Sequence, residues 1–162
     1  MKRLTQLLSL TLLLVMVAIP VTAHAFTVSG VGAKFGYASP QDLSGTAMVG
    51  GHMELEQGNT RIHLMPNVMY WKTNDVTNVN PNFDLYYHFG PEGTVTPYLG
   101  TGVGLDINHF GDTDHTDTNL AANFFGGVRF PGGGNHYFIE GRLTASDVSQ
   151  AAILGGFTFR NW

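Results

Sequence analysis

After residue 25, apolar side chains alternate with polar or small ones in runs of about ten residues. Successive side chains of a β-strand point to opposite faces, so this period of two predicts strands, and helical periodicity is hard to find in the same region. Alternating runs of this length are also typical of transmembrane β-barrel strands. Eight segments fit the pattern: 28–38, 46–56, 60–71, 82–90, 94–107, 119–130, 136–146 and 150–160.

The first 25 residues have the pattern of a cleavable signal peptide. Lys2 and Arg3 precede an apolar stretch over residues 4–19, and Ala23-His24-Ala25 is a small-x-small cleavage site. Polar residues interrupt the stretch, which is shorter than the roughly 20 apolar residues of a membrane-spanning helix. We therefore expect a signal peptide over 1–25 and one β-barrel domain over 26–162. The sequence has no cysteine, which excludes a disulfide framework and a lipoprotein anchor.

The connections between the segments differ in length in a regular order. Compact turn sequences at 57–59, 90–93 and 131–135 alternate with polar stretches at 39–45, 72–81 and 108–118, and with a shorter one near Asp147. Outer-membrane barrels have short periplasmic turns and longer external loops. The sequence thus predicts an all-β, eight-stranded antiparallel up-and-down transmembrane barrel with both termini in the periplasm.

The charged residues of the predicted strands all fall on the face opposite the apolar residues. An eight-stranded barrel is too narrow for an open channel, so we expect these side chains to fill the lumen as paired groups. The basic members are Lys34, Arg61, Arg129, Arg142 and Arg160, and the acidic members are Glu54, Glu56, Asp84, Asp106 and Glu140. A soluble barrel or sandwich with a solvated outer face shows the same alternation. The balance of five cations and five anions favours the lumen.

The net charge lies in the connections. Without Lys2 and Arg3, six basic residues face twelve acidic ones, so the formal charge changes from −4 to −6. With a balanced lumen this excess belongs to the loops, where Lys72 is outnumbered by aspartates and Glu92. An acidic surface of this kind excludes nucleic acid as an expected partner.

Aromatic residues are expected to form two girdles at the membrane interfaces. Those near predicted periplasmic strand ends are Phe89, Phe130, Tyr137, Phe159 and Trp162, and those near external ends are Tyr37, Tyr70 and Phe83. Core aromatics of a β-sandwich are the alternative interpretation.

Two segments resemble the small outer-membrane β-barrel superfamily of opacity-protein and attachment-invasion type: Thr96-Pro97-Tyr98-Leu99-Gly100-Thr101-Gly102-Val103-Gly104, and Ile153-Leu154-Gly155-Gly156-Phe157-Thr158-Phe159-Arg160. The resemblance spans the mature chain and implies a last strand that carries an assembly signal of alternating aromatics. Phe157 and Phe159 alternate as this requires, but Trp162 is out of phase with them.

Pro66 conflicts with a regular third strand, because proline removes a ladder donor where lipid offers no substitute. We expect a β-bulge near Met65 or Asn67 to accommodate it. Such a bulge would shift Arg61 and His63 relative to Tyr70.

The connections contain weak candidates for two kinds of site, a cation site and a catalytic site. Asp112, Asp114, His115 and Asp117 form a weak candidate for a divalent cation, but their spacing matches no EF-hand pattern, and a solvated acidic loop is favoured. Ser146 or Ser149 near His109 or His115 is a weak candidate for a nucleophile with its base, as in a lipid A deacylase or palmitoyltransferase. We expect no catalytic site, no metal and no cofactor.

The function expected from the sequence is that of a non-enzymatic outer-membrane barrel that displays acidic external loops. Its expected partners are outer-membrane lipid and lipopolysaccharide, the barrel-assembly machinery during biogenesis, and an unidentified extracellular molecule. The barrel is expected to be a monomer. The alternatives left open are a lipid A modifying enzyme, a minor channel in which Asp84, His88, Asp106, Arg129 and Glu140 line a water path, and a soluble periplasmic ligand-binding barrel.

Overall fold

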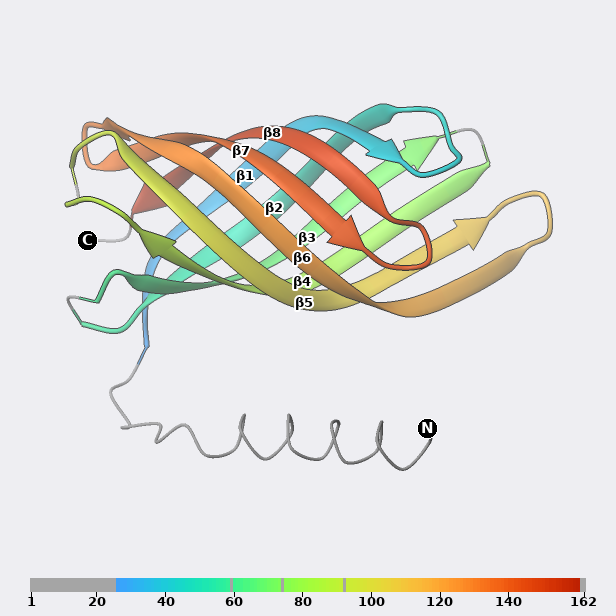
Figure 1. Cartoon of the computed structure of the whole chain (residues 1–162), viewed down its shortest axis with the longest axis horizontal. Helices are drawn as coiled ribbons and strands as arrows, with labels where there is room; N and C mark the ends of the chain where they lie inside the picture. The colour runs from blue at the N-terminus through green and yellow to red at the C-terminus, as the bar shows by residue number, and fades with distance from the viewer. Residues whose placement is uncertain (1–25, 59, 74, 92, 161–162) are drawn as a thin grey trace, which may run out of the picture.

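The computed structural model describes residues 26–58, 60–73, 75–91 and 93–160. The expected signal peptide and Trp162 lie outside these residues. Eight antiparallel strands follow one another around a closed barrel (Figure 1). Their bounds are β1 Thr27–Pro40, β2 Thr46–Glu56, β3 Ile62–Thr73, β4 Val76–His88, β5 Thr96–Phe110, β6 His115–Gly132, β7 Asn135–Ala145 and β8 Gln150–Arg160. The predicted eight-stranded up-and-down barrel is confirmed. No helix among the described residues is long and apolar enough to cross a membrane.

The barrel closes where β1 pairs with β8, from Gly30 opposite Arg160 to Pro40 opposite Gln150. The register of β1 against β2 shifts by one residue between Val28 and Gly30, which is a β-bulge next to the closing seam. Because the strand number is even, the first and last strands begin and end at the same end of the barrel (Figure 1). We call this the turn end, and the opposite end, where β1–β2, β3–β4, β5–β6 and β7–β8 are connected, the hairpin end.

The strands at the hairpin end are longer than the sequence predicted. β4 begins at Val76 and not at residue 82, β5 runs to Phe110, and β6 begins at His115 and not at residue 119. The expected loops 72–81 and 108–118 are therefore mostly paired strand, and the β5–β6 hairpin projects beyond the rest of the barrel (Figure 1). Asparagines at alternate positions of β4 explain the error, because a polar face that points inward has the composition of a loop.

The bulge expected at Pro66 is absent. β3 pairs with β4 in one unbroken register from Ile62 opposite Tyr87 to Thr73 opposite Val76. On its other side, the β2–β3 ladder is interrupted between His52 opposite Asn67 and Leu55 opposite Leu64, although the register is the same before and after. The missing N–H of Pro66 is thus accommodated by a local gap in the ladder, and the alternation of inward and outward residues in β3 continues unchanged.

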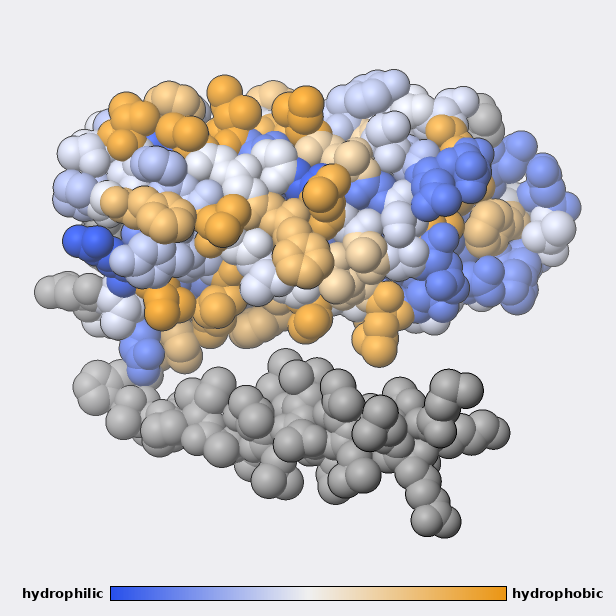
Figure 2. Space-filling model, viewed as in Figure 1, coloured by the Kyte–Doolittle hydropathy of each residue, from blue (hydrophilic) through white to orange (hydrophobic). Residues whose placement is uncertain are grey.

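The two faces of the wall have opposite polarity. Large apolar side chains point outward from every strand and include Val31, Phe35, Val49, Val68, Phe83, Leu85, Leu99, Val103, Phe124, Ile139, Leu143 and Ile153, all exposed. We call this set the apolar belt. Figure 2 shows hydrophobic side chains over the middle of the barrel wall and hydrophilic ones at the projecting hairpin tip. A monomeric soluble protein rarely exposes so large a continuous apolar surface.

Candidate functional site

The centre of the barrel holds a buried cluster of two cations and two carboxylates. Lys34 of β1 contacts Glu140 of β7 with Nζ 3.2 Å from Oε1. Arg142, two residues along the same face of β7, donates from Nε to Glu140 at 3.0 Å and from Nη2 to Asp84 of β4 at 2.6 Å. All four side chains are at most 2% exposed. We call them the central cluster, and it is neutral overall.

Neutral side chains complete the surroundings of the central cluster. The Tyr98 hydroxyl donates to Glu140 at 3.0 Å, and the Asn67 amide donates to Asp84 at 2.8 Å. The guanidinium of Arg142 lies 4.4 Å from the centroid of the Phe125 ring, which is cation–π geometry. Each carboxylate therefore accepts hydrogen bonds from both charged and neutral donors, as buried charges require.

A second cluster lies closer to the turn end. Glu54 of β2 accepts from Arg129 at 3.2 Å and from Thr158 at 3.3 Å, and its Oε1 lies 3.0 Å from Nε2 of His136. Arg129 also donates to the Tyr86 hydroxyl at 2.6 Å. These contacts join β2, β4, β6, β7 and β8 across the lumen, so they close the barrel interior with side chains.

A third polar group, centred on Asp106, lies toward the hairpin end. Asn78 donates to Asp106 at 2.6 Å and to Asn108 at 2.8 Å, and Asn108 in turn donates to Asp106 at 3.0 Å. The Ser146 hydroxyl donates to Asp106 at 2.7 Å. Asp106 thus accepts hydrogen bonds from two amides and a hydroxyl, all neutral.

An apolar plug closes the lumen at the hairpin end. Its members are Ala38, Met48, Met69, Trp71, Val76, Ala152 and Leu154, all buried, with Leu43, Phe110 and Val148 packed against them. Trp71 is the largest and is fully buried. The two polar clusters and this plug together fill the interior from the Glu54 contacts to the hairpin end.

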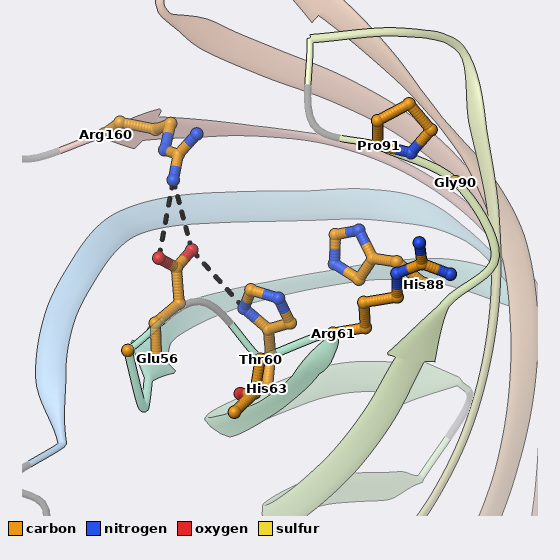
Figure 3. A pocket seen from close by; sticks show the side chains of 9 residues that line it. Glu56, Thr60, Arg61, His63, His88, Gly90, Pro91 and Arg160 are labelled. Carbon is orange, nitrogen blue, oxygen red and sulfur yellow. Dashed lines mark hydrogen bonds and ion pairs between the residues drawn. The ribbon is translucent and has the colours of Figure 1, made fainter.

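The turn end is open and contains a cavity of about 460 Å³ (Figure 3). Arg160 donates to Glu56 at 3.2 Å, and Nδ1 of His63 lies 3.3 Å from the same carboxylate. His63 stacks on His88 with ring centroids 4.4 Å apart. Arg61 also lines this cavity.

The structure places nine of the ten expected lumenal charges on the inner face. Seven are buried: Lys34, Glu54, Asp84, Asp106, Arg129, Glu140 and Arg142. Glu56 and Arg160 are partly exposed at the turn end. Arg61 differs, because it precedes β3 and is exposed. Since β3 begins at Ile62 and not at residue 60, the alternation of the strand does not extend to Arg61.

The expected girdle residues within the described part of the chain all point outward. Tyr37, Tyr70, Phe89, Phe130, Tyr137 and Phe159 are exposed near strand ends. Phe83 is exposed but lies in the middle of β4, because that strand begins six residues earlier than predicted. The prediction that Phe83 lies near an external strand end is therefore wrong.

The candidate catalytic and metal residues do not converge. Ser149 donates to the Ser146 carbonyl oxygen at 2.9 Å, Nδ1 of His109 lies 3.1 Å from the Thr116 hydroxyl, and His115 pairs with Asp117 at 2.8 Å. The described residues contain no group of three or more His, Cys, Asp or Glu arranged to hold a metal ion. The residues Asp112, Asp114, His115 and Asp117 lie in and beside the β5–β6 tip and are exposed.

Two solved structures share this architecture. The crystal structure of Neisserial surface protein A, NspA, superposes with a TM-score of 0.69 at 13% identity, over 85% of this chain and 99% of that one. The N-terminal β-barrel domain of Pseudomonas aeruginosa OprF superposes with a TM-score of 0.65 at 15% identity, over 83% and 98%. This chain has the fold of a small outer-membrane β-barrel. No family model matches the sequence, and no curated protein does.

The barrel's interior contains groups that the charge pattern alone did not identify. Asn78, Asn108, Tyr98 and Trp71 are buried parts of the filling. Their parity relative to the charged residues was the available signal: Asn108 lies two residues after Asp106, and Tyr98 lies an even number of residues before it. Extending the inward face of each charged residue along its strand would have found them.

Proposed function

We propose that this chain is a non-enzymatic integral outer-membrane protein whose barrel is a closed scaffold for acidic hairpin tips. The apolar belt carries the proposal, since exposed apolar side chains come from all eight strands. Exposed lysine, arginine and carboxylate side chains on the strands occur only at Lys72 and Asp117, both toward the hairpin end. Arg or Lys at the membrane midplane would cost about 2 to 4 kcal/mol, so this distribution suits lipid around the wall.

The filled interior supports a scaffold over a channel. In the described barrel, side chains meet across the lumen at three successive levels: the Glu54–Arg129 contacts, the central cluster and the apolar plug. Hydrogen-bonded polar networks of this kind hold a small barrel rigid. The proposal therefore includes a non-conducting barrel.

The hairpin end supports a role in surface display. Its exposed acidic residues are Asp42, Asp75, Asp112, Asp114, Asp117 and Asp147, against one exposed lysine, Lys72. With the termini in the periplasm, these carboxylates face the exterior. Outer-membrane lipid and lipopolysaccharide surround the wall, the assembly machinery inserts it, and the tips meet a partner outside the cell.

Cell fractionation with a heat-modifiability gel tests the location. The full chain is expected in the outer-membrane fraction, and the unheated sample is expected to migrate faster than the boiled one, because the barrel stays folded in detergent. Recovery from the soluble periplasmic fraction would contradict the proposal.

Single cysteines test the orientation, because the native chain has none. Thr113→Cys lies in the β5–β6 tip and Thr27→Cys at the start of β1, and both positions are exposed. A membrane-impermeant maleimide applied to intact cells should label T113C, while T27C should react only after the outer membrane is opened. Labelling of T27C on intact cells would show that the barrel has the opposite orientation.

A further inference from the structure

The open cavity at the turn end is lined by more cationic and imidazole groups than by anionic ones. Among the described residues that line it, Arg61, Arg160, His63 and His88 face a single carboxylate, that of Glu56. In Figure 3 the Glu56 and Arg160 pair lies on one side, Arg61 and His88 on the other, and His63 between them. Three connections or strand ends, from β2–β3, β4–β5 and β8, contribute to this one cavity.

The carboxylate of Glu56 is already engaged. It accepts two contacts from Arg160, at 3.2 and 3.4 Å, and lies 3.3 Å from His63. No carboxylate of the described residues lies within ion-pair distance of Arg61, although that side chain lines the cavity. Among the described residues, the guanidinium of Arg61 is thus without a paired carboxylate, and this group suits carboxylate and phosphate best because its donors form a planar fork.

His88 supplies the second observation. His88 is 3% exposed, lines the cavity, and stacks on His63 and Tyr86 with ring centroids 4.4 and 5.2 Å away. Its Nε2 is buried and has no hydrogen-bond partner among the described residues. Buried polar atoms in native proteins are nearly always paired, and this nitrogen belongs to a side chain that lines the cavity, so it is available to a ligand atom there.

We propose that this cavity binds the phosphate group of a small phosphorylated molecule or of a lipid headgroup. The guanidinium of Arg61 and an Nε2–H of His88 donate to different phosphate oxygens. Phosphate offers more acceptor positions than a carboxylate, which suits two donors from different side chains that lie close together in the cavity. A volume of about 460 Å³ also leaves room for a substituent on the phosphate. The site is independent of the proposed scaffold role.

Titration of inorganic phosphate into the full chain, refolded in an uncharged detergent, tests the site. Nitrogen-detected shifts of the histidine rings report it, and we expect saturable shifts at His63 and His88 but not at His109. Arg61→Gln and His88→Gln should each weaken binding about tenfold or more, the loss typical of one charge-assisted hydrogen bond. Lys72→Gln, which removes an exposed cation at the hairpin end, should leave the affinity unchanged.

Three results would overturn the proposal. These are the absence of saturable shifts, equal weakening by K72Q and R61Q, or acetate binding as tightly as phosphate. Arg61 is exposed and outside the strands, so R61Q is expected to fold even where H88Q does not, and a heat-modifiability gel checks both.

The source of the phosphate is resolved by changing the lipid. For a headgroup, nanodiscs containing phosphatidylglycerol should shift the His63 and His88 signals without added phosphate, and R61Q should abolish those shifts. For a free ligand, the same nanodiscs should leave the signals unshifted until glycerol phosphate is added. Failure of both additions would refute phosphate binding, whatever the cellular location of the barrel.

Discussion

Replacing Arg142 by methionine should strongly destabilise the barrel. The side chain is 3% exposed and is the one group that joins both carboxylates of the central cluster. Methionine keeps much of its length but removes the charge and all donors. The variant leaves Asp84 and Glu140 in the interior with Lys34 as their only cation within ion-pair distance in the described barrel.

The structure gives the magnitude. Arg142 donates one charge-assisted hydrogen bond to each carboxylate, at 3.0 and 2.6 Å, and such bonds contribute about 1.5 to 3 kcal/mol each. Breaking a buried ion pair by removing one partner typically costs about 3 to 5 kcal/mol, because a buried charge is left uncompensated. We therefore expect R142M to lose about 3 to 5 kcal/mol of unfolding free energy.

A double variant distinguishes lost charge compensation from lost packing. Adding Asp84→Asn to R142M leaves Lys34 paired with Glu140, so the remaining cluster is again neutral. The double variant should therefore be less destabilised than the sum of the two single variants, by at least 1 kcal/mol on the scale of coupled buried pairs. Urea unfolding of the refolded barrel in lipid vesicles, followed by tryptophan fluorescence and by gel mobility, measures all four proteins.

The exposed Lys72→Met is the matched control and should change stability by less than about 0.5 kcal/mol. An R142M variant within that same range of the native protein would refute the reasoning, as would strict additivity with D84N. Either result would mean that the central cluster is hydrated well enough to need no internal partner.

Three further substitutions test the wall and the plug by the same unfolding and gel assays. Val103→Arg in the apolar belt, at a position 60% exposed, should cost about 2 to 4 kcal/mol, whereas Thr113→Arg at the hairpin tip should be tolerated; equal effects would argue against lipid contact. Gly102→Val should prevent folding because its new side chain would meet Asp84, while Gly51→Val, where a new Cβ would make only an ordinary contact of 3.8 Å with the Gly32 carbonyl oxygen, should fold normally; the reverse order would contradict the packing. Trp71→Ala should cost about 3 to 5 kcal/mol, and a loss below 1 kcal/mol would show that the plug is loose.

The fold was predictable because lipid-facing and lumen-facing residues must alternate along each strand. In β7, Tyr137, Ile139 and Leu143 point outward, and Glu140 and Arg142 inward, as their sequence positions require. The positions of the strand ends were harder to predict from the sequence. A loop and an inward polar face share the same composition, so Asn78 and Asn80 were assigned to a loop although they line the lumen.

Which charged residues pair within the lumen could not be predicted from the sequence, since it depends on which strands face each other across the barrel. Glu140 contacts Lys34 from 106 positions away, and nothing local to either residue selects the other. Arg61 shows the complementary error: its parity suggested the lumen, but parity has no meaning one residue before the strand begins.

The correction at Arg61 changes the charge balance of the interior from five against five to four cations against five carboxylates. The central cluster is neutral, and Glu54 with Arg129 and Glu56 with Arg160 are each matched one to one. The carboxylate left over is Asp106, which has no cation within ion-pair distance in the described barrel and accepts from two amides and a hydroxyl. Neutralisation is thus local rather than global, because each buried charge needs hydrogen-bond donors or acceptors in direct contact with it. Asn78 of β4 and Asn108 of β5 supply the neutral donors of that unmatched carboxylate, so the polar groups beside the apolar plug are amides, whereas those toward the turn end are ion pairs.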